Sequence, residues 1–524
     1  MSDQSGSCRS RSGERIELTH LFSVIMPMHA SPLFRRKPRV NLIRLVLFLF
    51  VQSLLTPSGY ADSFALPEIG DPSGNLLSHS GEVRLGKAFM RSVRSSQPVN
   101  SDPLLNDYIQ SLGDRLAKNS DNPGRVFHFF LLDDAQVNAF AGPGGYIGVN
   151  TGLVTTTESE SELASVLSHE IAHITQNHLV RTFDALQRLS LPAAAIALTA
   201  LLIGAATKQA DAGLAIATGV QAGMAQSQIN FTRAHEEEAD SLGIQILAKA
   251  GFDPQAMPTF FDRMGQATRL YSSGELPEFL RTHPVTSNRI ADARGRAGDY
   301  PYRQSPDSLE YHLVRSALKY TQFNSSREAV TYFRENLINN RYRSEEGTRY
   351  GYTLALIADR QFKEARKQLD LLLRKRPEQI AYIDAEALLL EKTGKRREAQ
   401  QVIQDALELY PGNLVLSMRN AILLLDIGSA QQALTLLETQ LQGRPEDERL
   451  YHLAARAAGD AGKTSLAHQY MAEYYYLSGE LESAVQQLQI ALQDKSIDYY
   501  RSARLTARLR MLEDESNELK RRNE

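Results

Sequence analysis

The feature that most constrains the fold of this chain is a repetition with a period of 34 residues in its C-terminal part. Three residue types keep one phase: Ala365, Ala399, Ala433 and Ala467; Pro377, Pro411 and Pro445; and Gly394, Gly428 and Gly462. Such a period is typical of the helix–turn–helix tetratricopeptide unit, which buries a core only by stacking on its neighbours. A plain helical bundle is the alternative, but it gives no reason for three residue types to share a phase.

Upstream of the repeats, residues 66–298 have mixed patterns that predict a separate α+β domain. Residues 125–132 are strongly apolar and end at a turn pair, and residues 144–150 form a second extended run. Helical patterns follow around 159–179 and 235–250. We therefore expect a mostly helical domain with a small sheet, followed by an all-α superhelix.

The domain boundaries follow from shifts in composition. Residues 299–308 lie in a stretch rich in glycine, proline and serine and predict a linker. The repeat domain is then expected over 309–510, and the basic residues near the end predict a charged tail at 511–524.

The N-terminus resembles an export signal. Basic residues at positions 35–44 precede the apolar run 45–51, and small residues precede a cut after Ala61. We expect residues 1–61 to be a signal peptide with an extended N-terminus, which predicts a periplasmic protein. A membrane anchor is the alternative, although the apolar run is short for a span. The single cysteine, Cys8, excludes an internal disulfide and a cysteine-rich zinc site.

The composition narrows the classes of protein to which this chain can belong. The chain of 524 residues is 42% apolar and 23% charged, which is typical of globular proteins. Its 58 basic and 61 acidic residues nearly balance, so bulk charge gives no support for a nucleic-acid binder.

The strongest chemical signal is the sequence His169-Glu170-Ile171-Ala172-His173 in a helix-compatible run. Residues four apart lie on one face of a helix, so both imidazoles can bind one metal ion while Glu170 flanks it. A surface helix that happens to carry two histidines is the alternative. His178 is five residues beyond His173, and on a continuous helix it points away from the same ion.

A catalytic zinc needs a third protein ligand and keeps a fourth position for water. The best donors are Glu236 and Asp240, four apart in an acidic stretch, so that one can bind the metal while the other supports a ligand histidine. An acidic helix start that only complements the helix dipole is the alternative.

With both motifs present, the chain resembles the prenyl-protease-type zinc metallopeptidases, which pair His-Glu-x-x-His with a later Glu-x-x-x-Asp. The resemblance implies a zincin-like metallopeptidase domain, with Glu236 as the third ligand and Asp240 orienting a histidine. Residues 138–147 resemble the family's edge strand beside the cleft. Further family positions are matched by Arg233, Thr282-His283-Pro284 and Arg289-Ile290.

These ligands predict one Zn²⁺ per chain and hydrolysis of peptide bonds. Glu170 is expected to take the proton of the zinc-bound water as general base and to pass it to the departing amine. The extended segment 144–150 is expected to pair with a substrate backbone as an added strand.

Two other segments have open interpretations. By resemblance, His283 can approach the zinc as an extra, regulatory ligand, or it can order its loop against Arg289. Residues 189–206 are mostly apolar and are expected either to cover the cleft and touch the membrane surface or to be buried core.

The family resemblance also suggests partners. It implies unfolded or misassembled outer-membrane proteins as substrates, and the outer-membrane barrel-assembly machinery as a partner of the repeats. The period itself predicts only a binding surface. Two functions follow: a zinc endopeptidase that also assists assembly as a chaperone, or a tetratricopeptide adaptor with a latent or structural zinc site. An intact Glu170 favours the first, because a structural zinc does not need it.

Overall fold

The computed structural model describes residues 79–179, 191–203, 233–270, 278–301 and 305–523. The predicted signal peptide, residues 1–61, lies outside the described residues. The first part of the described chain contains three strands and a set of helices. Their bounds are α2 His79–Ser96, α3 Pro103–Ala117, β1 His128–Leu132, β2 Ala139–Ala141, the 3₁₀ turn η2 Pro143–Gly145, β3 Tyr146–Asn150, α4 Thr151–Thr156, α5 Glu160–Thr175, α7 Leu191–Ile203, α10 Arg233–Lys249, α11 Ala256–Leu270, α12 Glu278–Thr282 and α13 Ser287–Gly298.

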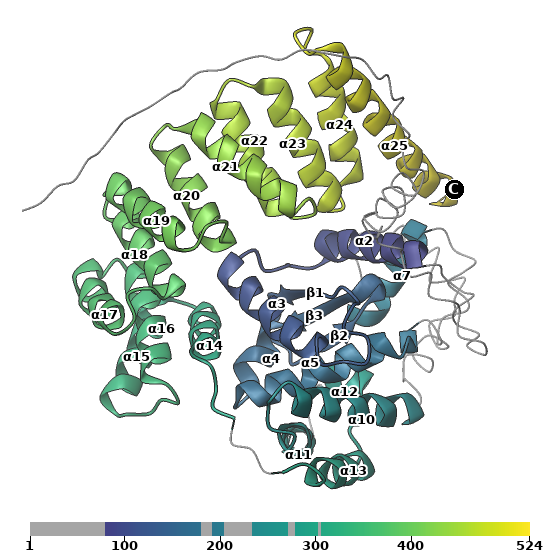
Figure 1. Cartoon of the computed structure of the whole chain (residues 1–524), viewed down its shortest axis with the longest axis vertical. Coiled ribbons are helices and arrows are strands. Elements are labelled where there is room, and N and C mark those ends of the chain that lie inside the picture. Colours follow the sequence, from purple (N-terminus) through teal and green to yellow (C-terminus); the bar gives the residue numbers. More distant parts are fainter. Residues whose placement is uncertain (1–78, 180–190, 204–232, 271–277, 302–304, 524) are drawn as a thin grey trace, which may run out of the picture. The chain divides into compact units, whose positions relative to one another are not determined.

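The strands form one small sheet in the order β1-β3-β2 (Figure 1). β3 lies in the middle, parallel to β1 and antiparallel to β2. The predicted pairing of residues 144–150 with a substrate is therefore wrong for β3, because both of its edges are already hydrogen-bonded within the sheet. The edge strand next to α5 is β2, within the segment 138–147 that the family resemblance assigned to an edge strand.

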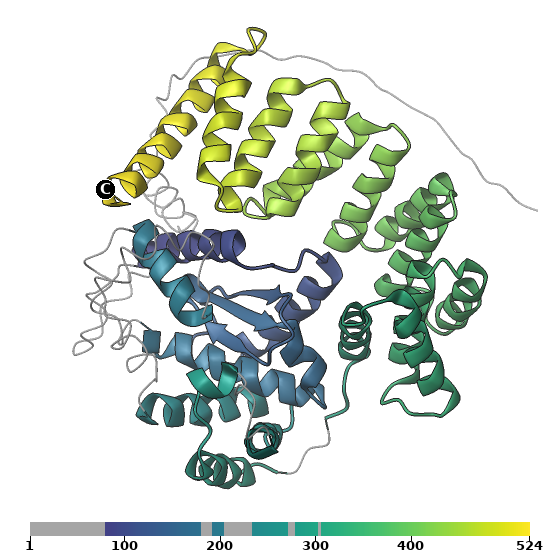
Figure 2. The same ribbon diagram turned by 180° about the vertical axis from the view of Figure 1, so that it is seen from behind.

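Both faces of the sheet are covered by helices. Consecutive side chains of β1 point to opposite sides of the sheet and so enter two different cores. Phe129 and Leu131 belong to the core formed with α3 and α5. Phe130 and Leu132 belong to a second core formed with α2 and α7. Figures 1 and 2 show α2 and α5 on opposite sides of the strands. This layering places α5, the helix with the His-Glu-x-x-His sequence, directly against the sheet.

α5 is the central helix of this domain and is buried from Glu160 to Ile174. The side chain of Ser159 accepts a hydrogen bond from the backbone N–H of Glu162 and so caps its first turn. The helix ends at Thr175, four residues before the end expected from the sequence. Asn177 adopts a left-handed backbone conformation with φ 54°, which is a common way to end a helix.

The described part of the apolar segment 189–206 forms α7. Its Ala194, Ala195, Leu198 and Leu202 are buried against α2 and the sheet. For residues 191–203 this packing favours the buried-core interpretation over contact with a membrane. No helix in the described ranges has both the length and the apolar character needed to cross a bilayer.

The second part of the described chain is all helical. Its helices are α14 Leu309–Thr321, α15 Ser326–Ile338, α16 Glu345–Ala358, α17 Phe362–Lys375, α18 Ile380–Lys392, α19 Arg396–Leu409, α20 Leu414–Asp426, α21 Ala430–Gly443, α22 Glu448–Asp460, α23 Thr464–Leu477, α24 Leu481–Leu492 and α25 Tyr499–Asn523. Successive helices from α16 to α25 pack side by side (Figure 2). The predicted fold class, a small α+β domain followed by a repeat superhelix, is confirmed.

The 34-residue period has a direct structural cause. Gly394, Gly428 and Gly462 lie in the turns inside successive helix pairs and have φ of 82°, 81° and 74°. This left-handed conformation strains any residue with a Cβ atom. In the preceding helix pair the same position is held by Arg360, which has φ 59°.

The sequence predicts a separate charged tail at 511–524. Residues 511–523 instead belong to helix α25, which continues to Asn523. Leu505 and Leu512, seven residues apart, are buried against Leu488 of α24. This apolar stripe extends the helix beyond the expected boundary at residue 510.

Candidate metal centre

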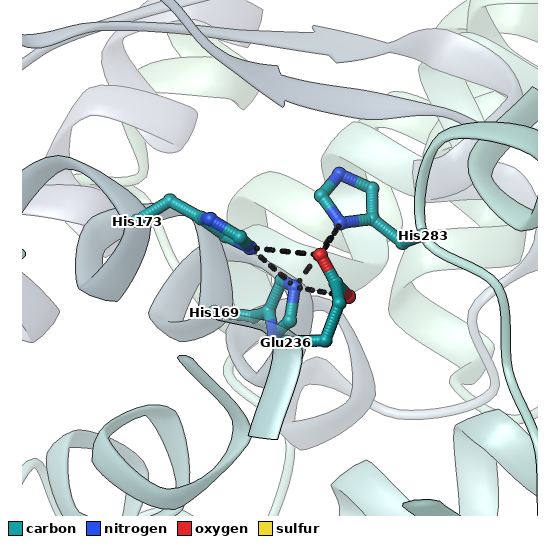
Figure 3. A group of neighbouring side chains, drawn as sticks. All are labelled: His169, His173, Glu236 and His283. Atoms are coloured by element: carbon teal, nitrogen blue, oxygen red, sulfur yellow. Dashed lines mark hydrogen bonds and ion pairs between the residues drawn. The ribbon is translucent and has the colours of Figure 1, made fainter. Parts of the chain in front are cut away.

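Two imidazoles converge on one face of α5, as the spacing of the motif predicts. Nε2 of His169 lies 3.0 Å from Nε2 of His173. Both side chains are 1% exposed, so neither belongs to a surface helix. Figure 3 shows both rings turned toward the carboxylate of Glu236.

Glu236 comes from the first turn of α10, which packs along α5. Its Oε1 lies 3.4 Å from Nε2 of His173, and its Oε2 lies 3.5 Å from Nε2 of His169. The close packing depends on Gly243, where a Cβ atom would lie 3.2 Å from the backbone nitrogen of His169. The structure thus brings the predicted third donor to the histidine pair.

His283 follows α12 and also faces this group. Its Nδ1 lies 2.9 Å from Oε1 of Glu236 and 3.3 Å from Nε2 of His169 (Figure 3). Its ring stacks on Phe279 and is buried. Of the two interpretations of His283, this placement agrees with an extra metal donor. Arg289 contacts the loop through the Pro284 carbonyl, to which its Nη1 donates at 3.0 Å.

An outer layer of contacts orients the inner donors. Oδ1 of Asp240 lies 2.9 Å from Nδ1 of His169, the ring nitrogen that faces away from the cluster. Arg289 donates to both oxygens of Asp240 at 2.8 Å and also lies 2.8 Å from Oε2 of Glu236. Sequence reasoning missed this double role of Arg289, which depends on α13 packing against α10.

The motif glutamate lies beside the cluster rather than within it. Glu170 is 1% exposed, and its carboxylate is not one of the four converging donors. Its Oε1 is 3.7 Å from Nε2 of His283, and the backbone N–H of Ala141 in β2 interacts with the same carboxylate. A buried carboxylate beside the metal donors, but not among them, is placed to accept a proton from a water molecule, as a general base must do.

The electrostatics favour a cation at this site. Burial lowers the pKa of His169, but the carboxylates of Asp240 and Glu236 outweigh it and raise that pKa to about 10. Burial opposes the charge of Glu236 as well, yet His283 and His169 hold its pKa well below the usual value. In contrast, burial dominates at Glu170 and raises its pKa.

The donors fit a zinc site. His169, His173, Glu236 and His283 each offer a ligand atom, and these atoms lie within 4.8 Å of one another. Imidazole nitrogens with one carboxylate oxygen are a common donor set for catalytic zinc. Within the ranges that the structure describes, this is the only such group of histidine, cysteine, aspartate or glutamate side chains.

Comparison with known proteins agrees with this geometry. Residues 103–297 match peptidase family M48, and residues 390–457 match a tetratricopeptide repeat family. The beta-barrel assembly-enhancing protease of Escherichia coli K12 is 34% identical over 479 residues, which is 91% of this chain and 97% of that protein. The enzyme of the same name from Yersinia pestis is 33% identical over 85% of this chain and 91% of its own.

A more distant relative matches less than half of the chain. The mitochondrial metalloendopeptidase OMA1 of Danio rerio is 30% identical over 208 residues, which is 39% of this chain and 43% of that protein. From these relatives and the family match, the chain belongs to peptidase family M48 and is a zinc metalloprotease that carries tetratricopeptide repeats.

Proposed function

We propose that this chain is a periplasmic endopeptidase whose single zinc ion is held by His169, His173 and Glu236. A zinc ion held by these residues would acidify a water molecule and polarise the peptide carbonyl. Glu170 takes the proton from the attacking water and gives it to the departing amine. The observation that carries this proposal is the buried Glu170 carboxylate, which lies beside the four converging donor atoms and not among them.

In the same proposal, His283 holds the enzyme latent. A water molecule needs the fourth position on the metal. Nδ1 of His283 is 3.3 Å from Nε2 of His169, so His283 would offer a donor to the metal in place of that water. The loop after α12 must then move, or His283 must turn away, before a substrate can react.

The substrates and partners follow from the relatives. We propose unfolded or misassembled outer-membrane proteins as substrates and the outer-membrane barrel-assembly machinery as the partner of the repeats. The names of the bacterial relatives and the repeat helices α16–α25 support this. An extended substrate segment is proposed to pair with β2, the edge strand beside α5.

A second function rests on the repeats themselves. Stacked helix pairs offer a surface that can hold a client without cutting it. With His283 in place, the chain is proposed to act as an adaptor or chaperone, and to cut only after the site opens.

The test uses casein cleavage, zinc content and three variants of the full chain. Glu170→Gln is expected to keep one zinc per chain and to lose cleavage, whereas Glu236→Gln is expected to lose zinc. Glu237→Gln, at an exposed neighbour on α10, is the charge control and should match the wild type. A chelator should abolish wild-type cleavage. Wild-type activity in Glu170→Gln would exclude Glu170 as the base.

A further inference from the structure

The break at the end of α5 places a third histidine behind the metal pair. After the left-handed residue Asn177, the chain turns so that His178 packs against His173 instead of continuing along the helix. Arg125 stabilises this turn by donating to the carbonyl of Ile174 and to Oδ1 of Asn177, each at 3.4 Å. A continuous helix would have pointed His178 away.

His178 forms a chain of contacts that starts at the candidate ligand. Its Nδ1 lies 2.9 Å from Nδ1 of His173, on the side of that ring opposite to Nε2. Its Nε2 lies 3.1 Å from Oε2 of Glu238 on α10. His178 is fully buried, and the side chain of Glu238 is 42% exposed. The ring of His235 stacks on His178 with centroids 4.3 Å apart, which restricts its orientation.

The proposed metal site determines the direction of these hydrogen bonds, and the inference therefore rests on that site. If Nε2 of His173 offers its lone pair to a metal, the neutral ring carries its proton on Nδ1. Nδ1 of His178, 2.9 Å away, can accept that proton when it is itself unprotonated. His178 then carries its own proton on Nε2 and donates it to the carboxylate of Glu238. The hydrogen bonds then run in one direction, from His173 through His178 to Glu238.

We infer that His178 is a positioning residue that orients His173 for metal binding, with Glu238 as the acceptor that sets its tautomer. His169 has the equivalent support from Asp240, at 2.9 Å. Glu236, Glu238 and Asp240 all lie on α10, so this helix supplies one candidate ligand and one support for each histidine. Outer contacts of this kind typically contribute about 10- to 100-fold to metal affinity.

The test compares two substitutions that separate hydrogen bonding from packing. In His178→Asn, an amide oxygen on Cγ takes the place of Nδ1 and can accept the proton of His173. In His178→Phe, the ring is kept and the acceptor is lost. We expect zinc affinity, measured by competition with a chromophoric chelator, to fall about 10- to 100-fold in His178→Phe. His178→Asn should be much closer to the wild type in zinc affinity. The absorption spectrum of the cobalt-substituted protein should likewise change more in His178→Phe than in His178→Asn.

If His178 acted only through packing, His178→Phe should bind zinc more tightly than His178→Asn, because Phe fills the space better than Asn. The inference is overturned if His178→Phe binds zinc like the wild type, or if His178→Asn is as weak as His178→Phe. If His178→Phe does not fold, the pair Glu238→Ala and Glu237→Ala decides. Lower zinc affinity only in Glu238→Ala supports the inference, and equal affinities overturn it. Absence of zinc from the wild type would instead refute the proposed function.

Discussion

Nδ1 of His283 lies 2.9 Å from Oε1 of Glu236, so the loop after α12 adds a fourth donor to a site that needs an open position for catalysis. Both side chains are buried, at 2% exposure, and the contact joins α10 to a segment 47 residues further along the chain. Removing His283 should therefore increase activity, whereas removing Glu236 should decrease it.

Replacing His283 with alanine is expected to increase casein cleavage by roughly tenfold, because it raises the population of the open, competent site. Zinc content should stay at one per chain, since three donors remain. His452→Ala, at an exposed histidine of the repeat helix α22, is the control and should leave the rate unchanged. Unchanged turnover in His283→Ala would remove the regulatory role of this residue.

Asp240→Asn is expected to lower zinc affinity about 10- to 100-fold, because the amide no longer offers a charged acceptor to Nδ1 of His169. The substitution also leaves Arg289 with only one carboxylate partner, Glu236. Chelator competition measures the affinity, and Glu237→Gln is the matched control on the same helix. A dissociation constant within twofold of the wild type would mean that Asp240 does not support the site.

Gly394→Ala is expected to destabilise the repeats by about 1 kcal/mol, because alanine is strained at a φ of 82°. The added Cβ would meet nothing within 4 Å, so the cost is one of backbone conformation alone. Arg360→Gly, at the same phase of the repeat, should be neutral or stabilising. Thermal unfolding of the full chain tests both.

The matched control for these backbone variants is Gly295→Ala inside α13. An added Cβ there also meets nothing within 4 Å, but the backbone is ordinarily helical. It should be neutral or slightly stabilising. A melting temperature of Gly394→Ala equal to that of Gly295→Ala would contradict the role assigned to the left-handed turn.

Glu346 should make part of the stability of the repeats dependent on pH. Burial raises the pKa of Glu346, but Lys375 and Arg376, at 2.7 Å and 3.1 Å, outweigh it and lower that pKa below its ordinary value. A carboxylate whose pKa is lower in the folded state stabilises the protein above its unfolded pKa. That contribution is lost as the pH falls through the folded pKa.

Glu346→Gln should therefore reduce the free energy of unfolding by about 0.5–1 kcal/mol at pH 7, and the difference should be smaller at pH 3. Urea unfolding at both pH values measures it. Glu378→Gln, at an exposed position between α17 and α18, is the control. A difference that persists unchanged at pH 3 would show that the loss comes from packing rather than from charge.

Much of the candidate site could be predicted because its chemistry depends on local geometry. The spacing of His169 and His173 requires only a helix to bring both rings to one side, and the structure has that helix. The acidic pair Glu236 and Asp240 could be selected as donors by residue type and spacing. The position of His178 could not be predicted in the same way, because it depends on the left-handed turn at Asn177.

The contacts of Arg289 and the order of the strands also could not be predicted from local sequence patterns. An arginine 49 residues beyond Asp240 carries no periodic signal that it will bind that carboxylate. Residues 144–150 have the composition of an extended segment, but whether such a strand lies at an edge or in the middle depends on its partners. Sheet order depends on which strands pair, and β2 has only three residues, too few for its pattern to stand out.

By itself, the amino-acid sequence determined the helix-pair repeat, the two imidazoles on one helical face and the acidic residues available to join them. These features follow from periods of 34 and 3.6 residues, which repeat along the chain and need no knowledge of its path. Only the tertiary structure decided that His283 faces Glu236, that His178 packs against His173 and that β2, rather than β3, lies at an edge of the sheet. The first contact joins residues 47 positions apart in sequence, and its distance depends on how buried helices pack. The other two depend on a left-handed turn and on strand order, which no residue period encodes.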